Sequence, residues 1–147
     1  MLLLNVVLFF WMQSEAPRVI VGLIDGQQLV VENPQFLGFI ETRADDAGLR
    51  YRQASFHGNL SLKSIARVDF VRYERNRPFL LTITLRNGQK IDVESEGPRF
   101  LTVKGNTDVG TVTINHPDPI SPEVRLRTKS PNRKDDLKIS YLEFPAP

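Results

Sequence analysis

Hydrophobic and polar residues alternate one by one through most of the chain. The stretch TITLR (82–86) places Ile83 and Leu85 on one side and threonine or arginine on the other. The same period returns in KIDVE (90–94), TVTIN (111–115), EVRLR (123–127) and LKISY (137–141). A period of two is the spacing of a β-strand with one buried face. Because no segment after Arg18 shows a helical period of 3.6, the sequence predicts an all-β protein.

The boundaries of the strands follow from this alternation and from the positions of proline and glycine. We predict strands at 18–24, 27–32, 36–42, 50–56, 59–63, 65–73, 79–86, 89–94, 99–104, 109–115, 123–129 and 137–144. Proline has no N–H and is excluded from central strands. The following prolines are all predicted to lie between strands: Pro34, Pro78, Pro98, Pro117, Pro119, Pro122 and Pro131. Gly22, Gly38 and Gly110 fall inside strand patterns, where glycine indicates a bulge or sharp bend, so we expect strongly bent sheets.

Two ten-residue stretches have nearly the same pattern. LIDGQQLVVE (23–32) and LRNGQKIDVE (85–94) each place an Asp-Gly or Asn-Gly pair between two short alternating runs. Such a pair tolerates the positive φ angles of a tight turn and is the strongest short-range signal for a β-hairpin. Both stretches are therefore predicted to be hairpins.

The similarity continues beyond the two hairpins. An aromatic-led strand follows each one, FLGFIET from Phe36 and FLTVKGN from Phe100, and then a strand that begins at Gly58 or Gly110. The first series ends with IARVDF and the second with EVRLRTK. This succession predicts an internal duplication of one β-unit, although chance similarity among short β-rich segments is the alternative. We expect two small barrel-like units, 18–77 and 78–147, that pack together because each alone would have a marginal core.

The order of these residues resembles that of a known group of small barrels. The pattern is carried by Leu23, Asp25, Gly26 and Gln27, and then by Gly58, Leu60, Leu62, Ile65, Val68 and Phe70. It resembles the tandem SH3-like or Sm-like small β-barrel units of uncharacterised exported proteins of Gram-negative bacteria. The resemblance implies a fold of two such units, with a C-terminal strand that closes the second. It assigns no functional residue, and the second unit departs from it by inserting HPDPISP (116–122).

The first 17 residues form a segment of a different kind. LLLNVVLFFWM (2–12) is far shorter than the roughly 20 residues that span a bilayer as a helix, and it has the length of a signal-peptide core. Ser14-Glu15-Ala16 provides a small-x-small cleavage site, but no basic residue precedes the run and Pro17 follows it. We expect an exported protein, periplasmic or associated with the envelope. A membrane anchor, or a core strand of a cytoplasmic protein, are the alternatives.

Composition narrows the chemistry without indicating a partner. The 147 residues include 19 basic and 17 acidic residues, so the net charge of +2 is nearly balanced. With no cysteine, disulfides and thiolate metal sites are excluded. His57 and His116 lack the spacing of metal ligands.

Acidic residues, serines and glycines also form no motif of a known catalytic site. The acidic residues Asp45-Asp46, Asp118 and Asp135-Asp136 form no calcium-binding loop and are typical of turns. No nucleophile motif and no phosphate-binding loop is present. The sequence therefore predicts no catalytic residue, no metal and no cofactor.

One stretch combines arginine with aromatic residues, RVDFVRYERNRPF (67–79). Such a combination on a small barrel is typical of single-strand nucleic-acid binding. The candidate binding surface consists of Arg67, Arg72, Tyr73, Arg75 and Arg77. Strand alternation places Arg67 and Tyr73 opposite to Arg72, and acidic residues dilute the charge, so a solvated strand end and linker is the favoured alternative.

Together these patterns favour a non-enzymatic exported protein of the cell envelope. It would act as a structural or protein-interaction module that contacts partners through sheet edges or loops. The first alternative is a cytosolic single-stranded nucleic-acid-binding protein with Sm-like or OB-like units. The second is a hydrolase or carbohydrate-binding domain, which would need several residues of one group in a single pocket: Asp45, Asp46, His57, Asp108 and His116. The oligomeric state stays open.

Overall fold

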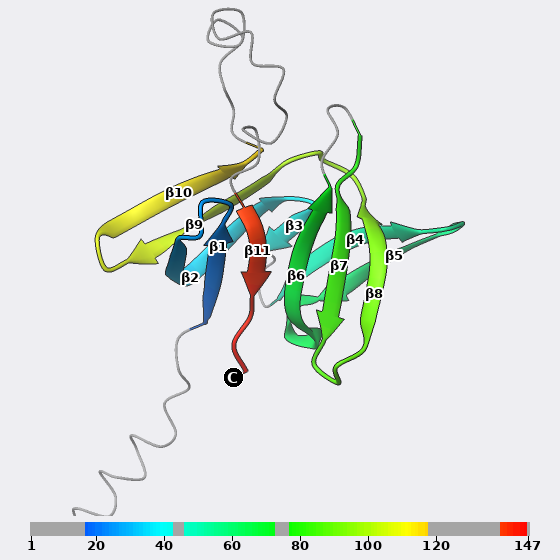
Figure 1. Cartoon of the computed structure of the whole chain (residues 1–147), viewed down its shortest axis with the longest axis horizontal. Coiled ribbons are helices and arrows are strands. Elements are labelled where there is room, and N and C mark those ends of the chain that lie inside the picture. Colours follow the sequence, from blue (N-terminus) through cyan, green and yellow to red (C-terminus); the bar gives the residue numbers. More distant parts are fainter. Residues whose placement is uncertain (1–16, 43–45, 73–76, 118–138, 147) are drawn as a thin grey trace, which may run out of the picture.

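Antiparallel β-structure accounts for most of the described chain, as the alternating pattern predicts. The computed structural model describes residues 17–42, 46–72, 77–117 and 139–146. Eleven strands form one sheet that curls into a half-barrel (Figure 1). The strands are β1 (Arg18–Leu23), β2 (Gln28–Gly38), β3 (Ile40–Thr42), β4 (Ala47–Gln53), β5 (Phe56–Ser61), β6 (Ile65–Arg72), β7 (Leu80–Leu85), β8 (Lys90–Ser95), β9 (Leu101–Thr107), β10 (Gly110–His116) and β11 (Ile139–Glu143). A short 3-10 turn, η1 (Leu62–Ser64), precedes β6.

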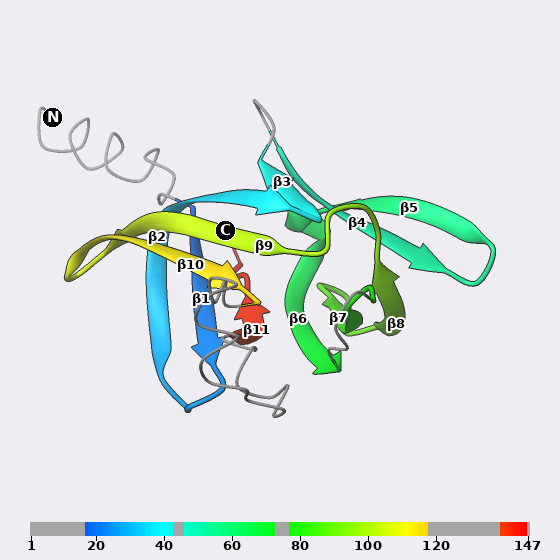
Figure 2. The ribbon, with the colours of Figure 1, turned by 90° about the horizontal axis from the view of Figure 1, so that it is seen from above.

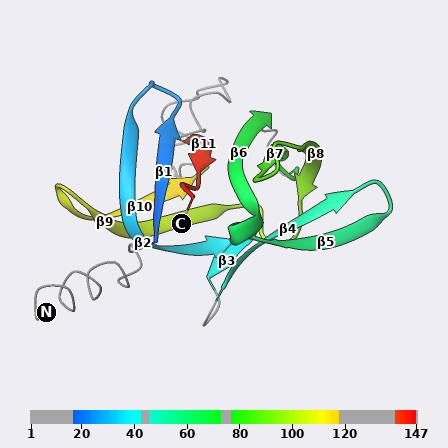
Figure 3. The same ribbon diagram turned by 90° about the horizontal axis from the view of Figure 1, so that it is seen from below.

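A sharp bend in the chain connects two groups of strands within the sheet. The first group contains β10, β9, β2, β1 and β11, and the second contains β6, β7, β8, β4, β5 and β3. The strand order is β10-β9-β2-β1-β11-β6-β7-β8-β4, and β4 pairs with β5 along one edge and with β8 and β3 along the other. Only Phe39 separates β2 from β3, so the chain crosses from one group of strands to the other at that point (Figure 3). Gly38 adopts a φ of 122°, and a side chain there would collide with the carbonyl oxygen of Phe100. The bend therefore requires glycine.

Ten of the eleven strands are arranged symmetrically about the contact between β11 and β6, and β3 has no counterpart. Outward from this contact lie β1, β2, β9 and β10 on one side, and β7, β8, β4 and β5 on the other. The hairpin β1–β2 thus corresponds to β7–β8, the hairpin β9–β10 to β4–β5, and β11 to β6. The last two hairpins project from opposite ends of the molecule (Figure 2). Each side contains strands from both halves of the sequence.

The two similar stretches of sequence form matching hairpin turns. In the first, the Gly26 N–H donates to the Leu23 carbonyl (3.0 Å) and the Leu23 N–H to the Gln27 carbonyl (2.8 Å). The second turn repeats both bonds between the corresponding residues, at 2.9 and 2.8 Å. Only the glycine of each turn has a positive φ; the preceding Asp25 or Asn87 side chain instead accepts a hydrogen bond from a glutamine N–H. Both predicted hairpins are confirmed.

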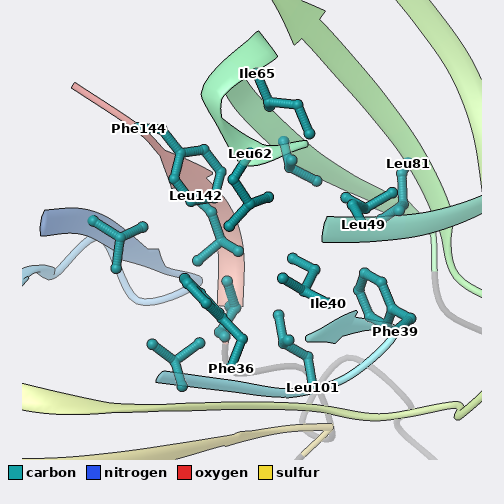
Figure 4. Close-up of a cluster of buried hydrophobic side chains, with 14 of the residues drawn as sticks. Phe36, Phe39, Ile40, Leu49, Leu62, Ile65, Leu81, Leu101, Leu142 and Phe144 are labelled. Carbon is teal, nitrogen blue, oxygen red and sulfur yellow. The ribbon is translucent and has the colours of Figure 1, made fainter. Parts of the chain in front are cut away.

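One continuous hydrophobic core fills the concave side of the sheet. Figure 4 shows side chains from both groups of strands pointing toward one another, including Phe36, Leu49, Leu81, Leu101 and Leu142. Phe39 and Phe79 are fully buried, and their ring centroids lie 5.4 Å apart. Because strands of both sides contribute to this core, the described residues do not form two clearly separate barrels.

Several details differ from the sequence predictions. Pro34 lies within β2 rather than between strands, and the pairing of β2 with β9 shifts register between Glu32 and Gln35 beside it. Such a bulge leaves a position without a ladder N–H, which accommodates proline. The predicted strand 123–129 and the N-terminal segment 1–16 lie outside the described residues. The strand order also makes β9 the counterpart of β4. The sequence similarity of FLTVKGN to FLGFIET instead matches β9 to the strand at Phe36.

Candidate functional site

The first residue of the predicted binding surface, Arg67, is bound within the molecule. Its Nε donates to Asp69 Oδ1 (3.0 Å), and its guanidinium lies 3.9 Å from the centroid of the Tyr141 ring. The same ring packs over Gly22, where any side chain would collide with it, and the Tyr141 hydroxyl accepts a hydrogen bond from Gln28. The guanidinium of Arg67 and the Tyr141 ring are therefore both engaged in contacts within the molecule.

A bulge in β6 changes the direction of Arg72. The pairing of β6 with β7 shifts register between Phe70 and Arg72, so that Arg72 lies opposite Leu80. Directly opposite residues share one face of a sheet. Leu80 in turn pairs with Glu94, and all three lie on the outer face. The prediction that Arg72 faces away from Arg67 is therefore wrong, because simple alternation ignores the extra residue of the bulge.

The remaining predicted residues divide between a groove and the undescribed part of the chain. Arg77 lies beside Arg72, Pro78 and Leu80 in a small hollow of about 70 Å³. Tyr73 and Arg75 lie outside the described residues. The structure thus brings two of the five predicted residues together and places Arg67 in a separate cluster.

A larger open groove of about 780 Å³ adjoins this hollow on the outer face. Its apolar residues include Val71 and Leu80, and its charged residues are Arg52, Asp92 and Glu94. Asp92 is held by the hydroxyl of Thr82 at 2.7 Å. Because both signs of charge line the groove, its electrostatics do not select one class of charged ligand. The alternation in TITLR and KIDVE could have indicated this face, since it directs Thr82, Asp92 and Glu94 outward.

The histidines and turn aspartates of the predicted alternatives do not come together. His57 is exposed on β5, where its Nδ1 lies 2.7 Å from Glu96 Oε2, whereas His116 is buried in the core. Asp46 accepts hydrogen bonds from the Ala47 N–H and the Ser61 hydroxyl, and Asp108 lies in the turn between β9 and β10. Within the described ranges, no group of three or more acidic or histidine residues could hold a metal ion. Asp45, Asp118, Asp135 and Asp136 lie outside them.

The two ends of the sheet are a feature that residue motifs could not reveal. In the described part of the chain, β5 pairs only with β4 and β10 only with β9. Neither strand contains Asp, Glu, Lys, Arg or Pro, the residues that commonly protect an edge from pairing with another chain. No residue of β5 is buried, whereas β10 buries Ile114 and His116. The edge of β5 is therefore the more accessible of the two.

Backbone hydrogen bonds of the neighbouring strand β4 fix the direction of the backbone along β5. The Arg50 N–H donates to the Phe39 carbonyl (2.8 Å), and the Arg50 carbonyl accepts from the Glu96 N–H (3.0 Å). Both groups thus point away from β5, so the facing pair of Arg50 and Asn59 is a non-hydrogen-bonded pair. Asn59 consequently directs its own N–H and carbonyl to the open edge. A partner strand would meet these groups there.

Comparison with known proteins does not assign the chain to a family. No family model, no curated protein and no solved structure matches it. In the ranges that the structure describes, no helix is long and apolar enough to span a bilayer.

Proposed function

We propose that the protein is a non-enzymatic interaction module of the cell envelope that binds an extended segment of another protein at β5. The observation that supports this most is the open edge of β5, accessible along its length and free of protective charge. An added strand gains main-chain hydrogen bonds, as in other cases of β-augmentation. The envelope location is supported by the signal-like run in residues 1–17.

The arrangement of the arginines favours a protein partner over nucleic acid. A nucleic-acid site needs cations that face the phosphates and aromatic faces on which bases stack. Arg67 instead binds Asp69 and Tyr141, and the groove beside Arg72 also contains Asp92 and Glu94. These contacts reduce the cationic surface that a phosphate backbone would meet.

Site-specific photocrosslinking in cells of the source organism tests this proposal. A photoreactive phenylalanine analogue replaces Phe56, which begins β5 and is 54% exposed, or Val71 in the groove. We expect a defined protein adduct from position 56 and none from position 71. The substitution Asn59→Pro removes the N–H that points to the open edge and should abolish the adduct, whereas Asn59→Ala, which keeps this N–H, should retain it.

Three results would contradict strand addition at β5. An adduct from position 71 alone would move the partner to the groove. An adduct from position 56 that persists in Asn59→Pro would show contact without main-chain pairing. Adducts that disappear after nuclease treatment would favour the single-stranded nucleic-acid alternative.

We infer further that the symmetric strand order arose by duplication of a five-strand unit. The first unit would comprise β1, β2, β4, β5 and β6, and the second β7 to β11. Equivalent cross-strand pairs support this, such as Val19 with Val31 and Leu81 with Val93. Five short antiparallel strands are also the content of an SH3-like or Sm-like barrel, although here the two units exchange strands.

A further inference from the structure

His116 is a polar residue in the interior of the sheet. Its side chain is fully buried at the end of β10, and its ring centroid lies 4.5 Å from that of Phe70 and 5.0 Å from that of Phe79. The N–H of Ile139, the first residue of β11, donates to its Nδ1 at 3.1 Å. Nδ1 therefore carries the lone pair and Nε2 the proton. Nε2 has no hydrogen-bond partner in the described part of the chain.

This hydrogen bond links two strands that are separated by 22 residues in sequence. β11 lies between β1 and β6, where it joins the two groups of strands (Figure 1). Ile139 pairs with Leu23 of β1, and the pairing of β11 with β6 begins two residues later at Tyr141. The bond to His116 thus holds the start of the strand that joins the two groups.

Among the described residues, charged side chains on the elements that pack against His116 do not compensate a charge on it. Arg67 and Asp69 on β6 bind each other on the outer face, and Glu41 on β3 binds Arg50. The other charged residues of these elements lie on exposed or half-buried positions away from the core: Arg72, Arg77, Lys104 and Glu143. Burial accordingly lowers the pKa of His116 from its ordinary 6.5 to about 3.

Protonation would change the imidazole in two ways. A proton on Nδ1 converts the acceptor of the Ile139 N–H into a second donor, so the hydrogen bond is lost. The resulting charge would also be buried among phenylalanine rings, at a high cost in desolvation. Both effects favour an arrangement in which the ring reaches water.

We propose that His116 is an acid-sensitive clasp, whose protonation releases the start of β11 from the end of β10 and opens the sheet between its two groups of strands. The proposal is independent of the partner at β5. The closed form stays neutral, while the released ring protonates at its ordinary value. The clasp is therefore fully effective above pH 6.5 and weakens as the pH falls toward 3, with the released fraction rising up to tenfold per pH unit.

Amide hydrogen exchange of the full chain, followed by NMR between pH 3 and 7, tests the clasp. After correction for intrinsic exchange rates, protection of Ile139 and Leu142 should fall with decreasing pH, while that of Ile83 in β7 falls less. His116→Leu should remove this difference, because leucine cannot be protonated. Leu62 is the counterpart of His116, since Leu60 pairs with Leu49 as Ile114 pairs with Val103, and it is buried, so leucine fits such a position. His57→Gln is the matched control, since it alters the exposed histidine and should leave the acid response unchanged.

Two further measurements keep the proposal testable if His116→Leu does not fold. His116→Gln retains a side-chain acceptor that does not titrate, and should also suppress the loss of protection. Nitrogen chemical shifts of the unaltered protein should show an unprotonated Nδ1 at neutral pH. An acid response that persists in either variant, or equal loss of protection in β7 and β11, would overturn the proposal.

Discussion

The turns β1–β2 and β7–β8 have the same backbone and different tertiary roles. Both use an αL glycine and the same two main-chain hydrogen bonds. The residue after the first leucine differs: Ile24 is 51% exposed, whereas Arg86 donates to the carbonyl oxygens of Lys63 (2.9 Å), Phe144 (2.9 Å) and Pro145 (3.4 Å). The turn sequence therefore specifies the hairpin, while one variable side chain connects it to the rest of the molecule.

The hairpins β4–β5 and β9–β10 also share a backbone pattern and differ in one side chain that contacts the rest of the molecule. Leu60 pairs with Leu49 as Ile114 pairs with Val103, and two residues further along lie Leu62 and His116. Both are buried, but only His116 holds a strand through a hydrogen bond. η1 alone connects β5 to β6, whereas residues 117–138 separate β10 from β11. The strand that follows the longer connection, β11, is thus the one that is also held by a side-chain hydrogen bond, from the Ile139 N–H to His116.

Cleavage of the chain between residues 76 and 77 should disrupt folding more than any of the substitutions proposed below. Each side of the sheet takes one hairpin from one fragment and its remaining strands from the other. We therefore expect fragments 1–76 and 77–147 to be unfolded alone, because each leaves sheet edges and core residues uncovered. Mixed together they should restore the sheet, as measured by near-ultraviolet circular dichroism and a single cooperative unfolding transition.

The same experiment separates the two architectures that a duplicated sequence allows. Two independent barrels would let each fragment fold alone with its own transition, whereas exchanged strands require both fragments. Cooperative unfolding of either fragment by itself would contradict the exchange.

Local features of this fold could be predicted from the sequence, and the arrangement of strands could not. The two hairpins follow from Asp25-Gly26 and Asn87-Gly88, because neighbouring residues determine a turn. The pairing of Phe36 with Val103 joins distant segments, and nothing in either segment identifies the other as its neighbour. The resemblance of the strands at Phe36 and Phe100 therefore matched two strands that are neighbours in the sheet and not counterparts in its strand order.

The candidate site shows the same limit. The arginine-aromatic stretch was visible in the sequence, but the bulge before Arg72 and the contact of Arg67 with Tyr141 depend on pairing between strands. The uncharged composition of residues 56–61 and 110–116 was also visible. This composition indicates unprotected edges only because the two strands lie at the ends of the sheet, which the sequence does not show.

Exchanging the variable turn residues should have an intermediate effect. Arg86→Ile removes hydrogen bonds from a charged donor to three carbonyl oxygens, and should lower the free energy of unfolding by about 2 kcal/mol. The reciprocal Ile24→Arg changes an exposed residue, and should alter it by less than about 0.5 kcal/mol. Urea denaturation measures both, and hydrogen exchange should locate the loss in the C-terminal strand. Equal effects of the two substitutions would show that Arg86 has no distinct role.

Replacing the turn glycines should have the smallest effect and the most equal one. Gly26 and Gly88 have φ angles of 91° and 89°, and a Cβ at either position would meet no atom within 4 Å. Gly26→Ala and Gly88→Ala should therefore cost only the backbone strain of a positive φ, about 1 kcal/mol each in urea denaturation. Asparagine at either position should cost less, because its short polar side chain tolerates this conformation. A difference above about 0.5 kcal/mol between the two alanine variants would mean that tertiary contacts such as those of Arg86 strain one turn. Equal losses in the free energy of unfolding would mean that each turn is determined by its own residues alone.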